Sequence, residues 1–308
     1  MAGSADTFSI DLKRPPPGGV QRSGAFTSTW RFIKRLFREK PLGAAGAVIF
    51  LIFLFCGIFA DVLAPYGMNE INLSNRLKAP SWIHPFGTDN LGRDMLSRCL
   101  YGAQISVIIG LAAATLATFI SVLLGILTGY IGGKFDLIVQ RVVDAWMSFP
   151  DLIILIVVVA VLGPGTWQIV GVLGLLLGIG GSRIIRSAVV SVRENMYVHA
   201  AQSIGASTGR ILWRHILPNV LPPVIVLFTS RVGTVILAES ALSFLGLGIP
   251  PPTPTWGGML SGSGRTFMFL GPWLVLFPGL SLTLVVYAIN VYGDALRDIF
   301  DPRMRGSK

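Results

Sequence analysis

Six long, mostly apolar stretches alternate with polar segments along the chain. A helix of about 20 apolar residues is enough to cross the hydrocarbon core of a bilayer. Pro150 interrupts the third stretch, and the second stretch is long enough to require tilting or projection beyond the bilayer. The pattern predicts an all-α membrane protein with six transmembrane helices. They cover approximately residues 42–63, 102–131, 139–162, 167–185, 220–245 and 272–292.

Composition removes the main alternatives to this class. Apolar residues make up 52% of the 308 residues, charged residues 13%, and the mean hydropathy is +0.68. Soluble domains carry about 25% charged residues, so a soluble globule of this composition could not keep its surface polar. Intrinsic disorder requires low hydrophobicity and is excluded for the chain as a whole.

The formal net charge of +10 is distributed unevenly along the chain. Lys and Arg concentrate in the cytoplasmic loops of membrane proteins. With the N-terminus inside, the predicted cytoplasmic segments hold 19 of these residues and the predicted outer loops hold five. The surplus is therefore an orientation signal that predicts cytoplasmic N- and C-termini, and it gives no support to nucleic-acid binding.

The segment before the first span divides into two parts. Residues 1–29 are rich in Gly, Pro and Ser without an apolar period, which predicts a disordered cytoplasmic tail. Residues 30–40 place four apolar side chains on one helical face among basic residues. Two interpretations are equally consistent with this pattern: an amphipathic helix on the inner leaflet, or a stop signal that anchors the first span. 

No catalytic or cofactor-binding pattern is present in the sequence. Gly132, Gly133 and Lys134 are followed by Phe135 and do not form a phosphate-binding loop. The three histidines show no metalloprotease spacing, and the two cysteines have no metal-site spacing. We therefore expect no enzyme activity, no cofactor and no metal in this chain, and any energy must come from a partner.

The segment between the fourth and fifth stretches, residues 186–219, carries the most specific local pattern. It predicts two short helices, of which the first ends at Gly205, a residue that suits the C′ position of a helix. Ser207 is the expected N-cap of the second helix, which is expected to stop before Pro218.

The first of these helices carries features of a contact surface. Ala200 and Ala201 are small enough to permit close approach of another surface, and Tyr197 and Ile204 could fill pockets in it. An ordinary amphipathic connector between two spans would show the same spacing, so the pattern alone leaves both interpretations open.

Two motifs in this segment resemble the loop signature of ABC importer permeases. Ala200-Ala201-x-x-x-Gly205 is followed after ten residues by Ile216-Leu217-Pro218. His199 stands where that family often has Glu, and His215 stands where it often has Ile. The peptide branch of the family commonly varies at both positions, so the two departures refine the resemblance.

Two further blocks are similar to the same branch. Residues 86–102 read FGTDNLGRDMLSRCLYG, and residues 245–257 read LGLGIPPPTPTWG. The three blocks stand in the family's order and cover most of residues 42–303. The chain therefore resembles the C-type permease subunit of dipeptide and oligopeptide ABC importers. This resemblance implies the type I ABC importer permease fold and a bacterial cell (inner) membrane location.

The resemblance also implies partners and a mechanism. The expected partners are a homologous B-type permease subunit, two cytoplasmic ATP-binding subunits that hold ATP and Mg, an extracytoplasmic peptide-binding protein, and membrane lipid. The first short helix would be the coupling helix seated in the ATPase, and ATP binding would rock the two permease halves. Some related permeases carry nickel or glutathione, which leaves these substrates as alternatives. The implied ATPase contacts are Tyr197, Ala200, Ala201, Ile204, Gly205 and Arg210.

This resemblance divides the chain into four parts. Residues 1–41 form a cytoplasmic tail, and residues 42–101 form the first span with an outer loop typical of peptide permeases. Residues 102–294 form the permease core with its coupling loop 186–219, and residues 295–308 form a second cytoplasmic tail.

Two ionisable residues fall inside the fifth stretch, Arg231 and Glu239. Groups at that depth usually face a cavity or pair with one another. Their separation of eight residues leaves them about 80° apart around a helix, which disfavours a direct pair. They either line a translocation path or bind peptide termini, or they make structural contacts with neighbouring helices or with the partner subunit. Arg141 and Asp144, three residues apart, predict a local ion pair, and the two GxxxG motifs at 125–129 and 174–178 predict helix packing.

Other membrane-protein classes lack their expected features. A secondary transporter would show inverted repeats with intramembrane carboxylates, and neither a convincing repeat nor many such carboxylates are found. A channel subunit would carry a selectivity segment, which is not evident. An ion-coupled secondary transporter remains the less favoured alternative.

Overall fold

The computed structural model describes residues 25–300, and this part of the chain contains helices and no β-strand. Five helical segments are long and apolar enough to cross a membrane. A sixth span results if α5 and α6, which are bent by 82° at a short break, count as one. The prediction of six spans is therefore confirmed. The spans are α2 (Pro41–Ile58), α4 (Met95–Ile131), α5 (Gly133–Met147) with α6 (Asp151–Leu162), α7 (Thr166–Arg193), α10 (Leu217–Phe244) and α13 (Trp273–Phe300).

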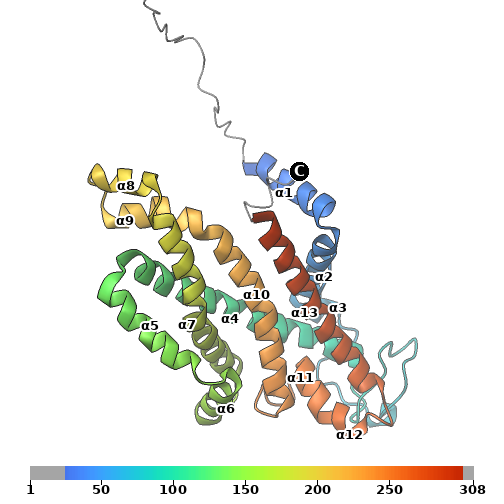
Figure 1. Cartoon of the computed structure of the whole chain (residues 1–308). Helices are drawn as coiled ribbons and strands as arrows, with labels where there is room; N and C mark the ends of the chain where they lie inside the picture. The colour runs from blue at the N-terminus through green and yellow to red at the C-terminus, as the bar shows by residue number, and fades with distance from the viewer. Residues whose placement is uncertain (1–24, 301–308) are drawn as a thin grey trace, which may run out of the picture.

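Shorter helices complete the described chain, and most of them lie at the two ends of the bundle (Figure 1). Helices α1, α8 and α9 share one end with the C-terminal end of α13, whereas α11 and α12 lie at the opposite end (Figure 1). The shorter elements are α1 (Ala25–Glu39), α3 (Ala60–Leu63), η1 (Leu73–Asn75), α8 (Met196–Ser203), α9 (Thr208–Ile211), η2 (Leu212–Ile216), α11 (Trp256–Met259), η3 (Leu260–Gly264) and α12 (Arg265–Phe267).

Several spans extend beyond their apolar stretches. Helix α4 begins at Met95 because the Asp94 carboxylate caps it by accepting a hydrogen bond from the Ser97 N–H at 2.8 Å. Helix α7 continues to Arg193, and α13 continues to Phe300. Hydropathy detects only the part of a helix that lies in hydrocarbon, so these polar ends were not predicted.

The break in the third span follows from Pro150. Proline has no backbone N–H and disfavours helical geometry in the residue before it, so α5 ends at Met147 and α6 begins afresh at Asp151. The interruption expected from the sequence is thus present as an 82° bend.

The predicted stop before Pro218 is wrong. Helix α9, the π-helical turn η2 and α10 form one continuous run from Thr208 to Phe244. In the π turn the Leu217 N–H bonds the carbonyl of Leu212, five residues back. Pro218, which has no backbone N–H, follows directly after this π turn, where the regular hydrogen-bond pattern of the helix is already interrupted.

Glycines let α4 and α7 pack closely. A Cβ at Gly125 would lie 2.7 Å from the Cβ of Ile185, and one at Gly178 would lie 2.8 Å from the Cβ of Ile120. Real side chains do not approach so closely, so both GxxxG motifs form helix contact faces as predicted. Helix α10 packs against α4, α7 and α13, which places it at the centre of the bundle.

The amphipathic segment predicted over residues 30–40 lies within α1. Its Leu36 is buried against Ala44 of α2 and against Ala295 and Ile299 of α13. Lys40 forms an ion pair with Asp298 at 2.5 Å. Part of the apolar face of α1 therefore covers the bundle. Residues 1–24 of the predicted disordered tail and residues 301–308 of the second tail lie outside the described residues.

Candidate functional site

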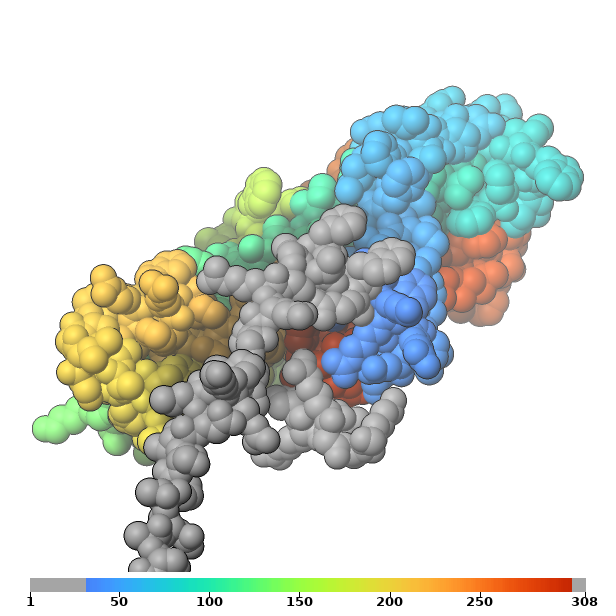
Figure 2. Space-filling view, turned by 90° about the horizontal axis from the view of Figure 1, so that it is seen from above, coloured from blue at the N-terminus to red at the C-terminus, as the bar shows by residue number. Residues whose placement is uncertain are grey.

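The predicted coupling loop contains the short helices α8 and α9 (Figure 1) and lies at one end of the molecule, where Figure 2 shows it in yellow. Helix α8 ends at Ser203, and Gly205 follows in the left-handed conformation with φ of +77°. The Gly205 N–H donates to the Gln202 carbonyl at 2.9 Å, and the Ala206 N–H donates to the Ala201 carbonyl at 3.0 Å. These two bonds form a Schellman motif, which confirms that Gly205 terminates this helix.

Five of the six predicted ATPase-contact residues lie at the surface. Tyr197 is 42% exposed and Ile204 85% exposed, while Ala201 is buried. Ala201 packs together with Val198 and Ile211 on the inner face of the loop. Its small size therefore serves packing within the chain. The other exposed members of the set are Ala200, Gly205 and Arg210.

Two large apolar side chains enlarge the exposed surface of this loop. Met196 is 88% exposed and Trp213 is 74% exposed, close in sequence to Tyr197 and Ile204. Neither residue was singled out from the sequence, although apolar residues in a polar loop were a usable signal. We call Met196, Tyr197, Ile204 and Trp213 the loop patch. Exposed large apolar side chains gathered in one loop favour an interaction site.

Ion pairs secure the base of the loop. Arg186 on α7 donates to Asp136 on α5, with 2.5 Å between Nε and Oδ1. Asp144 pairs with Arg141 at 3.3 Å, as predicted, and also with Arg183 of α7. The contacts to α7 join residues far apart in sequence, so only the fold could show them.

The block before α4 forms a polar network at the opposite end of the bundle. The buried Asp89 carboxylate accepts hydrogen bonds from the Leu91 N–H at 2.8 Å and from Arg93 Nε at 2.7 Å. The other buried carboxylate, Asp94, contacts His84 Nδ1 at 2.9 Å in addition to capping α4. The polar groups of this block therefore form their hydrogen bonds with one another, within the same chain.

The third family-like block packs against the second. Trp256 is fully buried, and its Nε1 donates to the carbonyl of Cys99 at 3.2 Å. Trp273 Nε1 likewise donates to the carbonyl of Thr88 at 3.0 Å. Two indole hydrogen bonds thus join the segment between α10 and the start of α13 to residues in and just before α4.

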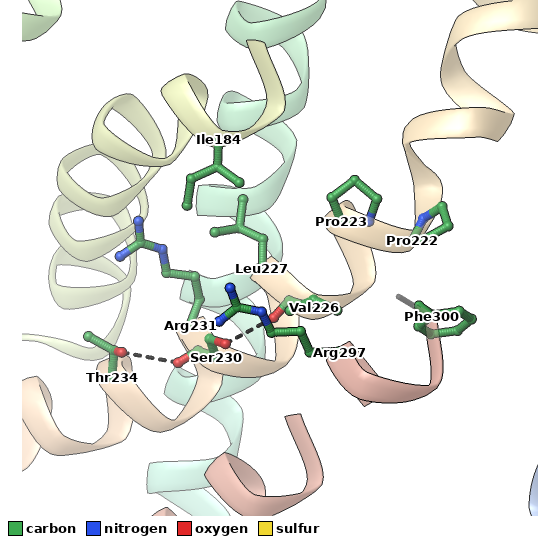
Figure 3. A pocket seen from close by; sticks show the side chains of 10 residues that line it. All are labelled: Ile184, Pro222, Pro223, Val226, Leu227, Ser230, Arg231, Thr234, Arg297 and Phe300. Carbon is green, nitrogen blue, oxygen red and sulfur yellow. Dashed lines mark hydrogen bonds between the residues drawn. The ribbon is translucent and has the colours of Figure 1, made fainter. Parts of the chain in front are cut away.

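The structure separates the two ionisable residues of α10. Glu239 is fully buried, and its Oε1 accepts a hydrogen bond from Ser243 Oγ at 2.7 Å. Ser240 Oγ lies 3.4 Å from the other carboxylate oxygen. Arg231 instead lines a cavity of about 640 Å³ between α7, α10 and α13 (Figure 3).

This cavity contains a second cation that the sequence did not reveal, Arg297 from the last turn of α13. A neighbouring cavity of about 440 Å³ shares Arg231 and Ile184 with the first and also contains Asp151. Arg297 and Asp151 were missed because only packing places them beside α10. The remaining lining residues of the larger cavity are Pro222, Pro223, Val226, Leu227, Ser230, Thr234 and Phe300.

Comparison with known proteins identifies the family. Residues 121–306 match the model of the binding-protein-dependent transport system inner membrane component, and residues 28–80 match the N-terminal TM domain of oligopeptide transport permease C. The chain is 40% identical over 296 residues to the dipeptide transport system permease protein DppC of Alkalihalophilus pseudofirmus, covering 96% of this chain and 97% of that protein.

Other relatives carry different substrate names. The oligopeptide transport system permease protein OppC of Bacillus subtilis is 38% identical, and the glutathione transport system permease protein GsiD of Escherichia coli is 39% identical. Each alignment covers 90% of this chain and 91% of the relative.

The fold also matches a solved transporter. An inward-facing structure of the MetNI methionine ABC transporter aligns with a TM-score of 0.55 and 17% identity, covering 67% of this chain and 98% of that chain. At this identity the match supports the fold alone. Together with the two family models and the full-length relatives, it shows that this multi-pass membrane protein belongs to the inner-membrane permease components of binding-protein-dependent ABC importers.

Proposed function

We propose that this chain is one half of the translocation pore of an ATP-driven importer for dipeptides or oligopeptides in a bacterial inner membrane. The names of two full-length relatives, a dipeptide and an oligopeptide permease, support this substrate class. The distribution of Lys and Arg supports cytoplasmic termini, and α1, α8 and the end of α13 share one end of the bundle (Figure 1).

The α8–α9 loop is the proposed seat of a cytoplasmic ATPase. The observation that carries this assignment is the loop patch, whose exposed apolar side chains come from α8, from its C-cap Ile204 and from η2, with the end of α8 fixed by the Gly205 turn. An apolar surface on a rigid support suits a protein contact, because little conformational freedom is lost on binding. Tyr197, Ala200, Ile204, Gly205 and Arg210 are the proposed contacts, and Ala201 supports them from within.

The continuous helix from Thr208 to Phe244 provides a path for coupling. One end of this run belongs to the loop, and its middle carries Arg231 into the cavity. A movement of α8 and α9 with the ATPase would therefore be transmitted to α10 along this run. The π turn between Leu212 and Ile216 is the proposed point where the run can adjust its pitch.

The proposed complex contains several other components. A homologous B-type permease would complete the pore, two ATP-binding subunits would bind and hydrolyse ATP with Mg, and an extracytoplasmic binding protein would deliver the peptide. This chain would supply neither catalytic groups nor a cofactor site. Within this complex the chain would consist of a tail (residues 1–41), a first span with its loop (42–101), a permease core (102–294) and a second tail (295–308).

We assign the two ionisable residues of α10 to different tasks. Arg231 is proposed to line the translocation path, because it borders both cavities. Glu239 is proposed to stabilise the packed interior, because its fully buried carboxylate is hydrogen-bonded by serine hydroxyls of its own helix.

Reconstitution of the complete importer in proteoliposomes tests the function. We expect ATP-dependent uptake of labelled di- and tripeptides that requires the binding protein. Gly205→Asp should abolish uptake and peptide-stimulated ATP hydrolysis, because it strains the turn and adds a charge beside the loop patch. Gln202→Asp, at an exposed position of the same helix, adds a charge without changing the turn. Comparing the two variants separates the effect of the charge from the effect of the strained turn. Uptake by this chain alone, driven by an ion gradient, would refute the proposal.

Glutathione is the second candidate substrate, because the glutathione permease relative is as similar as the peptide permeases. Competition between labelled tripeptide and unlabelled glutathione in the same vesicles distinguishes the two. Preferential uptake of glutathione would replace the peptide assignment and leave the permease assignment intact.

A further inference from the structure

Arg231 lies where two cavities adjoin. The larger cavity, of about 640 Å³, is also lined by Arg297, and the smaller one, of about 440 Å³, is also lined by Asp151 and by Arg183, whose guanidinium pairs with Asp144. Both volumes fall in the range of sites that enclose small molecules. Two arginines therefore face the larger cavity, and the adjoining cavity adds a carboxylate, that of Asp151, near Arg231.

The three charged groups have no ion-pair partner within the described residues. Among residues 25–300, no carboxylate lies within 4.0 Å of Arg231 or Arg297, and no cationic nitrogen lies within that distance of Asp151. Nε of Arg231 is buried and has no hydrogen-bond partner. A buried guanidinium N–H without an acceptor is costly, so the arrangement favours a ligand that supplies an anionic oxygen.

The walls between the charges are mostly uncharged. Val226, Leu227 and Phe300 line the larger cavity with apolar surface. The hydroxyls of Ser230 and Thr234 donate to backbone carbonyls at 3.0 Å, which leaves their oxygens free to accept hydrogen bonds. Such a wall can accept apolar or polar side chains of a ligand without selecting one of them.

The position of the negative group depends on the bend in the third span. Asp151 is the first residue of α6, directly after the 82° break at Pro150. A straight helix would carry this residue to another position relative to α10. The bend thus brings Asp151 into the cavity that Arg231 also lines.

A zwitterion fits this distribution better than a simple anion does. An inorganic phosphate or a lipid phosphate would gain from the two arginines but would be repelled by Asp151 in the adjoining cavity. A free peptide carries a carboxylate at one end, which complements Arg231 and Arg297, and an ammonium group at the other, which complements Asp151.

We propose that these cavities hold a short peptide by its two termini. The terminal carboxylate binds Arg231 and Arg297, and the terminal ammonium binds Asp151, while the side chains meet the uncharged wall. This inference rests on the proposed function and adds a recognition mode, in which the free termini rather than the side chains are read.

Equilibrium binding to the complete membrane complex in nanodiscs, without the binding protein, tests this assignment. The probes are trialanine with free ends, its N-acetyl form, its C-terminal amide and the doubly blocked form. Arg231→Gln and Arg297→Gln should each weaken binding of the free peptide about tenfold or more and leave binding of the amide unchanged. Asp151→Asn should weaken binding of the free peptide and the amide, with no effect on the N-acetyl form.

Two further variants control for charge and folding. Arg38→Gln removes an exposed charge from α1 and should change none of the four affinities. Arg231→Lys keeps the charge and should recover part of the binding lost in Arg231→Gln. Subunit assembly is followed by size-exclusion chromatography in every case.

Several outcomes would overturn the assignment. Equal weakening of all four probes, or failure of the subunits to assemble, would show that the charges are structural. Loss of co-purified anionic lipid without a change in terminus dependence would identify a lipid phosphate as the ligand. Absence of terminus-dependent binding to the unmodified complex would also refute it. ATP-driven uptake of free trialanine by the unmodified importer tests the proposed function separately.

Discussion

The block before α4 and the α8–α9 loop both carry recognisable motifs, but their residues are used in opposite ways. In the first block the polar groups of Asp89 and Asp94 are buried and bonded to neighbours in the same chain. In the loop the motif presents exposed apolar side chains such as Ile204 to the outside. A motif whose polar groups are hydrogen-bonded within the chain stabilises the fold, whereas a motif whose apolar side chains remain exposed indicates a partner.

The same contrast recurs within the membrane. Glu239 is enclosed by hydroxyl groups of its own chain, whereas Arg231 borders two cavities with its Nε unpartnered. The sequence did not predict this difference, because the two residues lie only eight positions apart in the same apolar stretch. The following four predictions test the contrast, from the largest expected effect on stability to the smallest.

Asp89→Ala should cause the largest loss of stability. It removes the acceptor of the Leu91 N–H and of Arg93 Nε and leaves the largely buried Arg93 and Arg98 without their carboxylate. Breaking a buried ion pair from one side costs about 3–5 kcal/mol. The thermal midpoint and the yield of folded protein in detergent measure this effect. Glu70→Ala removes an exposed acid from the same loop, and an equal loss in that control would contradict the prediction.

Gly92→Ala and Gly205→Ala form a matched pair. Both glycines have positive φ, +73° and +77°. A Cβ at Gly92 would lie 1.8 Å from the Asn72 carbonyl oxygen, whereas one at Gly205 would meet nothing within 4 Å. Both changes should cost about 1–2 kcal/mol for the left-handed backbone. Gly92→Ala should cost a further 1–3 kcal/mol or so for overpacking. Equal thermal midpoints for the two variants would show that the carbonyl moves aside freely.

Glu239→Ala should destabilise the bundle by about 1–3 kcal/mol, because two buried serine hydroxyls lose their acceptor. Arg231→Gln should leave stability unchanged, since no ion pair is lost within the described residues. Thermal midpoints of the two variants, measured alongside uptake in vesicles, check this. A stable Glu239→Ala protein that fails in uptake would instead place Glu239 on the translocation path.

Ile204→Ser should change stability by no more than about 0.5 kcal/mol, because the side chain is 85% exposed. The same substitution should reduce ATP hydrolysis stimulated by the loaded binding protein several-fold, since it removes part of the loop patch. Gln202→Ser on the same helix serves as the control and should affect neither quantity. Normal stimulation with the Ile204 variant would remove the loop patch from the ATPase contact.

Much of the architecture could be predicted from local patterns alone. Six spans, the interruption at Pro150, the helix end at Gly205 and the Arg141–Asp144 pair each depend on residues close together in sequence. Hydropathy, proline chemistry and the left-handed preference of glycine act over a few residues, so the sequence determines them directly. The helix end expected before Pro218 is absent because the chain forms a π turn just before this proline and the helix continues. Local sequence preferences do not predict such a turn.

Only the tertiary structure decided which motif residues face inward. It buried Ala201, enclosed Glu239 and brought Arg297 and Asp151 to the cavities beside Arg231. These groups come from helices separated by tens of residues, and their meeting depends on how α6, α10 and α13 pack. Sequence spacing defines positions around one helix, whereas the neighbours of that helix are set by close packing throughout the bundle.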